Sequence, residues 1–499
     1  MAPRVLASPG SPTPPAGGAE AGRASRRPRP AAPRVPAGVA AGHPATAAAG
    51  LGILEAGGSA ADAAVAAVLA SSAAESILTS IGGGGFATYY DAARQSVTCL
   101  DFFCSVPGLD GDRIAGPMDP IEVSFGGVPL MYSIGGASVA VPGVAAGCGV
   151  VHERWGRLPW HQVVEPAIAL ARSGVALPPA QARTLASVAP ALLPGDGAGI
   201  YAPRGVLLRG GELLHHPGLA RALTALADEG PAVFYTGALG RALVDAVRAA
   251  GGALGPEDLA AYRVDELPVE RADVADRSVF GRADLNGTVA TLRALPANVA
   301  ELARPERAVA LARTLRERSR QRLGDTTNVS VVDPDGNACV VTTTLGLGAG
   351  VWIPGTGINL NSMLGEDELL TADLVPGRRM ASMMCPLVAV DPDGSLVVAA
   401  GSAGASRIRT ALVDTLLGVL VDGLDMASAV ARPRFHVVGE TVHAEAGYPE
   451  DELAALTDAG YLVNRWDHLS HYFGGVSAVG LDGAAGDPRR GGAGMLLRT

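Results

Sequence analysis

Before residue 326 the hydrophobic residues mainly follow a helical pattern, and from residue 326 an alternating pattern begins. A helix is predicted over Thr46–Ala56, where apolar residues share one side and a Gly-Gly pair follows. The run Ser59-Ala-Ala-Asp62 has the spacing of a capping box and predicts the start of a second helix, to about Ala70. Because that helix contains almost only Ala and Val, it has no polar face and must be buried. Residues 150–260 are also predicted to be largely helical.

Strands are predicted at Ala87–Tyr90 and Ser96–Phe103, just after a run of four glycines that allows backbones to approach closely. Asn328–Val332 and Ala338–Thr344 alternate with period two around an Asp-Pro-Asp-Gly turn, which predicts a β-hairpin. The same arrangement recurs in Leu387–Ala400. Two such hairpins, with helices between and after them, predict an α+β protein of layered sheets covered by helices.

Two segments before residue 326 have distinctive compositions. Residues 1–42 are mostly Pro, Ala, Gly and Arg, and cannot bury enough apolar surface to offset the entropy lost on ordering. They are predicted to be a disordered tail, with order beginning at His43. Residues 297–323 are rich in Ala, Leu, Arg and Glu and predict a helix that ends just before the strands.

Composition excludes several classes of function. The chain of 499 residues has no Lys, so a Walker-A phosphate loop and a Lys Schiff base are both excluded. Its net charge of −10 argues against a nucleic-acid partner. The five cysteines are dispersed, and no His or Cys spacing predicts a metal site; His215-His216 looks like a lone exposed pair. No long apolar stretch predicts a membrane partner, and the start of the chain has no apolar leader, so a cytoplasmic protein is expected.

The segment Asp325-Thr326-Thr327-Asn328 stands where a charged helical region gives way to a strand. A Thr hydroxyl is a weak nucleophile that needs a nearby base. If the chain is cut before Thr326, the new α-amino group, with a reference pKa of about 7.7–8.0, is such a base. The residues alone leave a second interpretation open, because β-branched Thr also simply favours strands.

Several stretches of the chain match one known family in the same order, from about residue 43 to the end. They are His43-Pro44, Leu54 to Ala64, Ile81 to Phe86, Gly156 to Trp160, Thr326-Thr327, Ser330 to Asp333, Pro354 to Ile358, Gly401 to Ile408 and Pro433 to His436. In these stretches the sequence resembles the γ-glutamyltransferases, N-terminal-nucleophile hydrolases that cleave themselves and then use the new N-terminal Thr.

The resemblance implies a four-layer αββα sandwich formed jointly by a large part, 43–325, and a small part, 326–499. Cleavage of the Asp325–Thr326 bond would leave the two fragments together as a heterodimer, and no metal or organic cofactor is implied. Carried over by position, the catalytic residues are the nucleophile Thr326, Thr344 as its hydrogen-bond partner, and Gly404 with Ala405 as the oxyanion hole. Ala405 replaces a family Gly but keeps the backbone N–H, so the resemblance leaves the oxyanion hole intact if no positive φ is required there.

The residues that would bind substrate depart from the family. The Arg that pairs with a glutamyl α-carboxylate is replaced by Phe103, and the family Asn falls on Gly346. Further family positions are occupied by Met363, Glu366, Ser382 and Met383, which predicts an apolar pocket with Glu366 left to pair an amine. The alternatives are that these side chains only fill the core, or that Arg378 or Arg379 compensates for the lost Arg.

The sequence therefore predicts a self-cleaving Thr amidase or acyltransferase acting on a small-molecule amide that is not standard glutathione. Two alternatives remain at this point. One is a true γ-glutamyltransferase or glutathione hydrolase with a rearranged pocket. The other is an uncleaved, inactive binding protein of the same fold.

Overall fold

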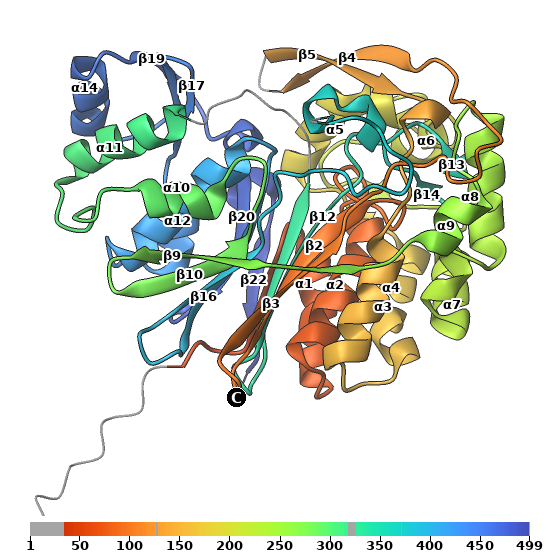
Figure 1. The fold of residues 1–499 in the computed structure, drawn as a ribbon, viewed down its shortest axis with the longest axis horizontal. Coiled ribbons are helices and arrows are strands. Elements are labelled where there is room, and N and C mark those ends of the chain that lie inside the picture. Colours follow the sequence, from red (N-terminus) through yellow and green to blue (C-terminus); the bar gives the residue numbers. More distant parts are fainter. Residues whose placement is uncertain (1–33, 126–127, 318–325, 371, 499) are drawn as a thin grey trace, which may run out of the picture. The chain divides into compact units, whose positions relative to one another are not determined.

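The computed structural model of the chain describes residues 34–125, 128–317, 326–370 and 372–498. Its centre is a pair of mainly antiparallel sheets packed face to face (Figure 1). The first sheet has the strand order β22 (Ala493–Leu496), β1 (Gly38–Ala41), β11 (Thr327–Val332), β12 (Ala338–Thr344), β2 (Gly84–Asp91), β3 (Ser96–Phe102) and β8 (Asp265–Leu267). The second has the order β21 (Gly483–Gly486), β20 (Gly475–Gly480), β16 (Leu396–Ala403), β15 (Leu387–Val390), β10 (Arg277–Arg282) and β9 (Val269–Val274).

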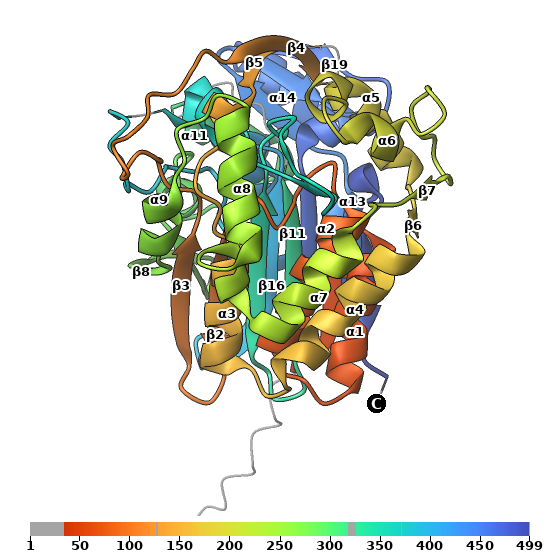
Figure 2. The ribbon, with the colours of Figure 1, turned by 90° about the vertical axis from the view of Figure 1, so that its right-hand side faces the viewer.

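Helices cover the outer face of each sheet. On the first sheet lie α1 (Pro44–Glu55), α2 (Ala60–Ala74) and α3 (Val144–Trp155); α4 (Trp160–Ser173) packs on α2 and α7 (Leu219–Glu229) on α4. α8 (Ala238–Ala249) belongs to the same hydrophobic core, and several of these helices stand in front of the strands in Figure 2. On the second sheet lie α10 (Thr288–Ala294), α12 (Arg407–Leu420) and α13 (Met426–Ala431). Branched and small side chains such as Val332, Val340, Val388 and Val479 fill the space between the sheets. The predicted α+β class is confirmed, and the two predicted hairpins are β11–β12 and β15–β16, one in each sheet.

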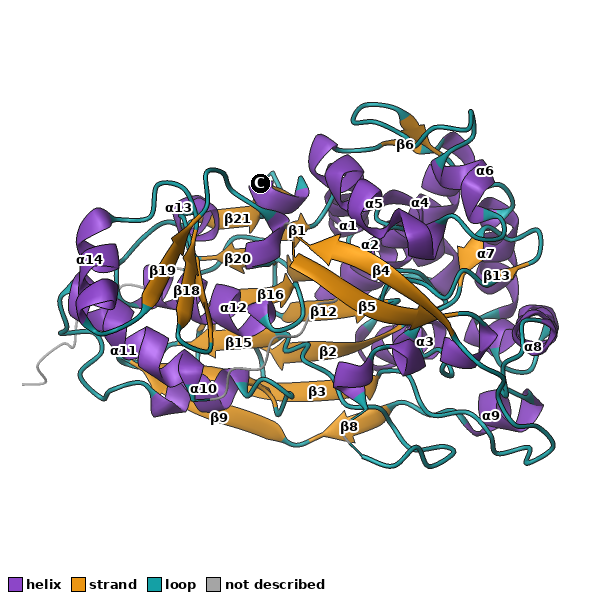
Figure 3. Cartoon of the chain, turned by 90° about the horizontal axis from the view of Figure 1, so that it is seen from above, coloured by secondary structure: helices purple, strands orange, loops and turns teal. Residues whose placement is uncertain are grey.

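Smaller elements surround these layers. A three-stranded sheet of β17 (Phe435–Val438), β18 (Thr441–Ala444) and β19 (Leu462–Arg465) lies beside α11 (Arg304–Arg316) and α14 (Glu450–Asp458) (Figure 3). The remaining elements are β4 (Asp119–Phe125), β5 (Val128–Ile134), β6 (Val175–Ala176), α5 (Pro179–Leu192), α6 (Gly197–Tyr201), β7 (Leu213–Leu214), α9 (Pro256–Ala261), β13 (Trp352–Ile353) and β14 (Ile358–Asn359), with short 3-10 turns between them.

The predicted capping box is present at the start of α2. The Ser59 hydroxyl accepts a hydrogen bond from the Asp62 N–H at 3.1 Å, and the Asp62 carboxylate accepts one from the Ser59 N–H at 3.0 Å. That carboxylate also accepts the N–H groups of Arg157 and Leu158, so it ties the helix to the loop before α4. Every residue of α2 is buried, as its lack of a polar face predicts.

Two predicted boundaries differ from the structure. Order begins before His43, because Gly38–Ala41 forms β1, a fully buried strand between β11 and β22; residues 1–33 of the predicted tail lie outside the described residues. Within the helix predicted over 297–323, the described residues contain α11, which begins only at Arg304 and has Pro305 in its first turn, whereas residues 318–323 lie outside the described residues. Pro fits the first turn because the N–H it lacks has no partner inside the helix.

Candidate active site

Thr326 lies directly before β11, at the end of the hairpin that the sequence predicts. Thr327 pairs with Thr343 in the antiparallel register of β11 and β12. One further step of that register places Thr326 opposite Thr344. Both side chains are buried, with exposed fractions of 4% and 6%. The two threonines assigned to catalysis by resemblance therefore face each other across the first sheet's central hairpin.

The glycine run at the start of β2 allows this hairpin to lie against its neighbour. A Cβ atom on Gly83 would stand 2.1 Å from the Thr344 carbonyl oxygen, and one on Gly85 would stand 2.5 Å from that of Thr342. Only glycine fits at such distances. The predicted close approach of backbones is thus confirmed, and it occurs beside Thr344.

The loop after α2 holds the same hairpin from the other side. The Thr79 hydroxyl donates a hydrogen bond to the Thr343 hydroxyl at 2.9 Å. The Thr327 hydroxyl donates to the carboxylate of Glu75, a buried residue at the end of α2. These contacts fix Thr327, which follows Thr326, and Thr343, which precedes Thr344, and so help to fix the backbone at both site residues.

Gly404 and Ala405 lie at the end of β16, immediately before the first turn of α12. Their carbonyl groups accept hydrogen bonds from the N–H groups of Arg407 and Ile408, at 3.0 and 3.1 Å. Both have positive φ, 117° for Gly404 and 50° for Ala405. The condition placed on Ala405, that no positive φ be required there, is therefore not met: the residue takes the left-handed conformation, with its backbone N–H still present. The N-terminal end of a helix carries partial positive charge, which suits an oxyanion.

Ala405 provides a test of how much the left-handed conformation costs. We expect Ala405→Gly to change the free energy of unfolding by less than about 1 kcal/mol, because relief of strain is offset by the greater freedom of Gly in the unfolded chain. We expect Ala405→Val to lower the free energy of unfolding by about 2 kcal/mol or more, because a β-branched residue at positive φ is an outlier and the site is closely packed. Thermal unfolding of the two purified variants measures the difference, and equal midpoints would contradict it.

The residues assigned to the site surround one cavity of about 20 Å³, which has room for about one water molecule. The lining consists of Phe103, Thr326, Thr344, Met363, Glu366, Leu369, Ser382, Met383, Met384, Ala405 and Ile408. Gly404 precedes one of them directly in the chain. The structure thus brings together every site residue predicted on the described part of the chain, whereas Asp325 and the bond to be cleaved lie outside the described residues.

An aromatic stack forms one wall of this cavity. The Phe103 ring stacks on Phe86, with ring centroids 5.5 Å apart, and the Arg282 guanidinium lies over the Phe86 ring, 3.8 Å from its centroid. Arg282 also donates a hydrogen bond to the Met384 carbonyl oxygen at 2.7 Å. Phe103 thus has a fixed position, and the wall it presents is apolar.

Glu366 occupies the space next to Gly346. A Cβ on Gly346 would stand 2.7 Å from both Glu366 Oε1 and the Ser362 hydroxyl oxygen, and the φ of Gly346 is 70°. Position 346, where the family has Asn, therefore has no room for a side chain in this protein. Ser382, also in the lining, is buried, and its hydroxyl accepts a hydrogen bond from the Met384 N–H at 3.2 Å.

Neither Arg378 nor Arg379 replaces the lost arginine. Arg378 is exposed, and Arg379 pairs with Asp101 at 3.3 Å and with Asp265 at 3.0 Å, away from the cavity. Burial raises the pKa of Asp101, although Arg379 acts to lower it. No arginine is among the described residues that line the cavity.

Sequence reasoning missed three residues of the lining, Leu369, Met384 and Ile408. Only Met384 had a signal, since it adjoins Met383. His216 was expected to be exposed, but it is buried and its ring contacts the Ser76 hydroxyl at 2.8 Å. Burial lowers the pKa of His216 to about 4.

Among the described residues, no group of His, Cys, Asp and Glu side chains has the arrangement of a metal site. The same part of the chain contains no helix long and apolar enough to cross a membrane.

Comparisons with known proteins agree on one family. The family described as "Gamma-glutamyltranspeptidase" matches residues 46–297 and 289–497. The chain is 30% identical to "Glutathione hydrolase proenzyme 1" of Schizosaccharomyces pombe, over 83% of this chain and 76% of that protein. It is 29% identical to "Acylase ACY 1 proenzyme" of Pseudomonas sp. strain SE83, over 89% of each. The fold is similar to that of cephalosporin acylase from Bacillus halodurans, with a TM-score of 0.75, 22% identity, and coverage of 95% of this chain and 99% of that one.

Proposed function

Because the chain belongs to the γ-glutamyltranspeptidase family of N-terminal-nucleophile hydrolases and acyltransferases, we propose that it cleaves itself before Thr326 and then acts as a threonine amidase or acyltransferase on an apolar acyl amide. The observation that carries the proposal is the single cavity lined by Thr326, Thr344 and Ala405 together with the apolar side chains of the predicted pocket. The relatives' names include both glutathione hydrolases and acylases, so the family alone leaves the substrate open.

In the proposed cleavage, the Thr326 hydroxyl oxygen attacks the Asp325 carbonyl carbon and the peptide C–N bond breaks. Breaking that bond frees the α-amino group of Thr326, and water then hydrolyses the resulting ester, which releases the Asp325 carboxylate and restores the Thr326 hydroxyl. The fragments 1–325 and 326–499 stay together as a heterodimer, because β11 and β12 of the second fragment pair with β1 and β2 of the first.

In the proposed reaction, the α-amino group takes the proton of the Thr326 hydroxyl as the oxygen attacks the amide carbon of the substrate. The Gly404 and Ala405 N–H groups donate hydrogen bonds to the oxyanion, and Thr344 orients the nucleophile. The proton then passes to the leaving amine. Water or a second amine accepts the acyl group from the Thr326 ester.

The apolar lining supports an acyl group without an α-carboxylate. A hydrogen bond to a charged group contributes about 1.5–3 kcal/mol, or roughly 10- to 100-fold in binding. With Phe103 in place of Arg, a γ-glutamyl group would lose that contact and would place its carboxylate against an aromatic ring.

Two chromogenic p-nitroanilides test the substrate, one with a γ-glutamyl group and one with a hexanoyl group. We expect kcat/KM to be at least about tenfold higher for the hexanoyl compound, and both activities to disappear in Thr326→Ala. A preference for the γ-glutamyl compound would instead favour a glutathione hydrolase, as the relative of S. pombe is named.

The methionine side chains that line the cavity are expected to move when an acyl chain binds. The cavity holds about one water, so an acyl chain must displace flexible side chains, and three methionines, Met363, Met383 and Met384, line it. We expect Met383→Ala to raise kcat/KM for a decanoyl p-nitroanilide relative to the hexanoyl one by about tenfold, since the space of the removed side chain is then available. Met118→Ala is the matched control, because Met118 lies outside this lining; the same ratio in both variants would contradict the assignment.

A further inference from the structure

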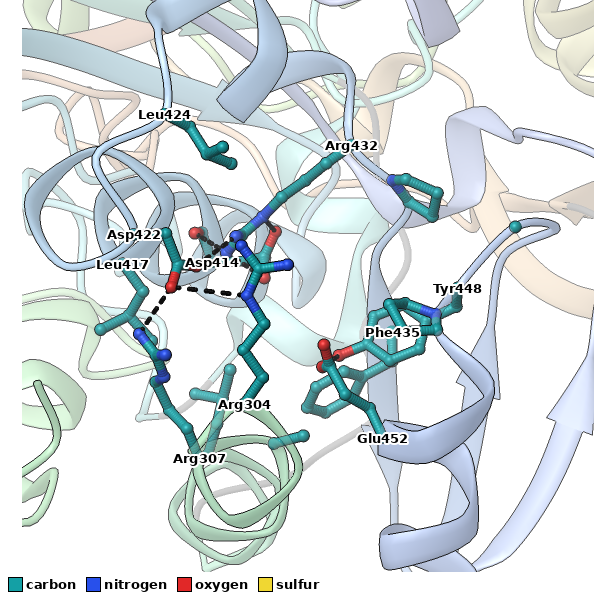
Figure 4. A pocket seen from close by; sticks show the side chains of 15 residues that line it. Arg304, Arg307, Asp414, Leu417, Asp422, Leu424, Arg432, Phe435, Tyr448 and Glu452 are labelled. Carbon is teal, nitrogen blue, oxygen red and sulfur yellow. Dashed lines mark hydrogen bonds and ion pairs between the residues drawn. The ribbon is translucent and has the colours of Figure 1, made fainter. Parts of the chain in front are cut away.

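A second cavity, of about 180 Å³, lies between α11, α12, α14 and β17 (Figure 4). It shares no lining residue with the cavity at Thr326. Arg304 and Arg307 come from α11, which precedes Thr326 in the chain, whereas the walls contributed by α12, β17 and α14 follow it. A cavity of about 150 Å³ is known to hold a benzene molecule, so this one accommodates a small organic ligand.

One wall of this cavity carries more arginines than carboxylates. Arg432 is fully engaged, since it contacts Asp414 at 2.8 Å and Asp422 at 2.9 Å. Arg307, only 11% exposed, also contacts Asp422 at 2.9 Å. Arg304 is 57% exposed and reaches Asp422 only at 3.8 Å, longer than a hydrogen bond. Three guanidinium groups thus meet two carboxylates, and Arg304 is the cation with the weakest contact.

The facing wall carries a carboxyl group without a strong cation contact. Glu452 accepts a hydrogen bond from the Tyr448 hydroxyl at 2.7 Å, and burial raises the pKa of Glu452. In Figure 4 the Arg304 guanidinium and the Glu452 carboxyl group point into the same space from two elements. A ligand with a carboxylate at Arg304 and an ammonium group at Glu452 would therefore give each of these two side chains an oppositely charged partner.

The rest of the lining is apolar. Tyr448 and Phe435 form an edge-to-face pair with centroids 5.6 Å apart, and Leu417 and Leu424 lie on the side of the acidic residues. Such a surface favours a hydrocarbon side chain. A ligand that carries two opposite charges close together beside a hydrocarbon group is an apolar α-amino acid.

We propose that this cavity binds a free apolar L-α-amino acid, with its carboxylate at Arg304, its ammonium group at Glu452 and its side chain against Phe435 and Tyr448. The bound amino acid would hold α11, the last described helix before Thr326, to elements that follow Thr326. Binding does not require the Thr326 nucleophile, so this proposal and the proposed reaction fail independently.

Isothermal titration calorimetry of the full chain with matched probes tests the proposal. The probes are L-leucine, L-leucinamide, which lacks the carboxylate, and 4-methylpentanoate, which lacks the amine. We expect saturable binding of L-leucine in the wild type and in Thr326→Ala, and at least tenfold weaker binding of each analogue. L-phenylalanine serves as a second amino-acid probe; failure of both amino acids to bind the wild type would overturn the proposal.

Two variants locate each charge. Arg304→Gln is expected to weaken L-leucine binding at least tenfold and to abolish the preference for leucine over leucinamide. Glu452→Gln is expected to weaken it similarly and to abolish the preference over 4-methylpentanoate. Arg313→Gln and Asp451→Asn are the controls, because these exposed residues lie on the same two helices outside the lining. Unchanged leucine binding in both Arg304→Gln and Glu452→Gln, or equal loss in the controls, would overturn the site.

Discussion

Thr326→Ala is expected to yield a single uncleaved chain of 50.2 kDa and to lose amide hydrolysis by at least about a thousandfold. The reason is that one hydroxyl serves both the cleavage and the reaction in the proposed mechanism. Without it, neither the attack on Asp325 nor the acyl ester can form. Intact mass spectrometry of freshly purified protein, followed by the p-nitroanilide assay, measures both effects on one sample.

Two further variants separate chemistry from packing. Thr326→Ser retains the hydroxyl and is expected to cleave, with the smaller fragment beginning at residue 326, though with a changed rate because the methyl group is absent. Thr441→Ala removes a hydroxyl in β18, outside the cavity lining, and is expected to behave as wild type. A wild-type chain that remains intact at neutral pH, or a Thr326→Ala chain that is cleaved, would contradict the mechanism.

Local patterns were enough to predict the elements around Thr326. The β11–β12 hairpin follows from period-two alternation around an Asp-Pro-Asp-Gly turn, and burial of α2 follows from its lack of any polar face. Both depend on a periodicity that lies within one stretch of sequence. The grouping of Phe103, Met363 and Met383 in one cavity was predictable only through resemblance, because these residues are far apart in the chain.

Other features depend on contacts that no local pattern records. β1 has only four residues, mostly small, and it becomes a strand because β11 and β22 supply partners on both sides. Ala405 has positive φ although its type disfavours it, because the turn from β16 into α12 imposes that conformation. Arg379 seemed able to replace the lost Arg, yet two aspartates hold it elsewhere.

A buried ionic cluster near the C-terminus has the largest expected effect on stability. Arg489 donates to Glu445 at 2.8 Å and to Asp487 at 3.1 Å, and Arg434 contacts Asp487 at 2.8 Å. The side chains of all four are at most 2% exposed. The next residue, Arg490, lies beside the Thr326 carbonyl group. Loss of this cluster would therefore disturb the site as well as the fold.

Arg489→Met is expected to lower the free energy of unfolding by about 3–5 kcal/mol, because it leaves Glu445 and part of Asp487 as buried charges without their partner. Arg465→Met is the matched control: Arg465 pairs with Glu450 on the surface, where solvent screens the pair, so its loss is expected to leave the unfolding midpoint nearly unchanged. Both are compared by thermal unfolding in the Thr326→Ala background, so that cleavage does not differ between samples. Equal midpoints for the two variants would contradict the role of the cluster.

The same cluster determines how stability depends on pH. Burial alone would raise the pKa of Asp487, but Arg434 and Arg489 outweigh it and hold that pKa below its ordinary value of 3.8. A carboxyl group whose pKa is lower in the folded state contributes stability that is present above the unfolded value and is lost as the pH falls through the folded one. The contribution of Asp487 is therefore complete at neutral pH and disappears only below about pH 4. In Arg489→Met the pKa of Asp487 rises, so loss of stability on acidification is expected to begin at higher pH than in Arg465→Met. Unfolding midpoints measured from pH 7 to pH 3 test this order, and parallel curves for the two variants would contradict it.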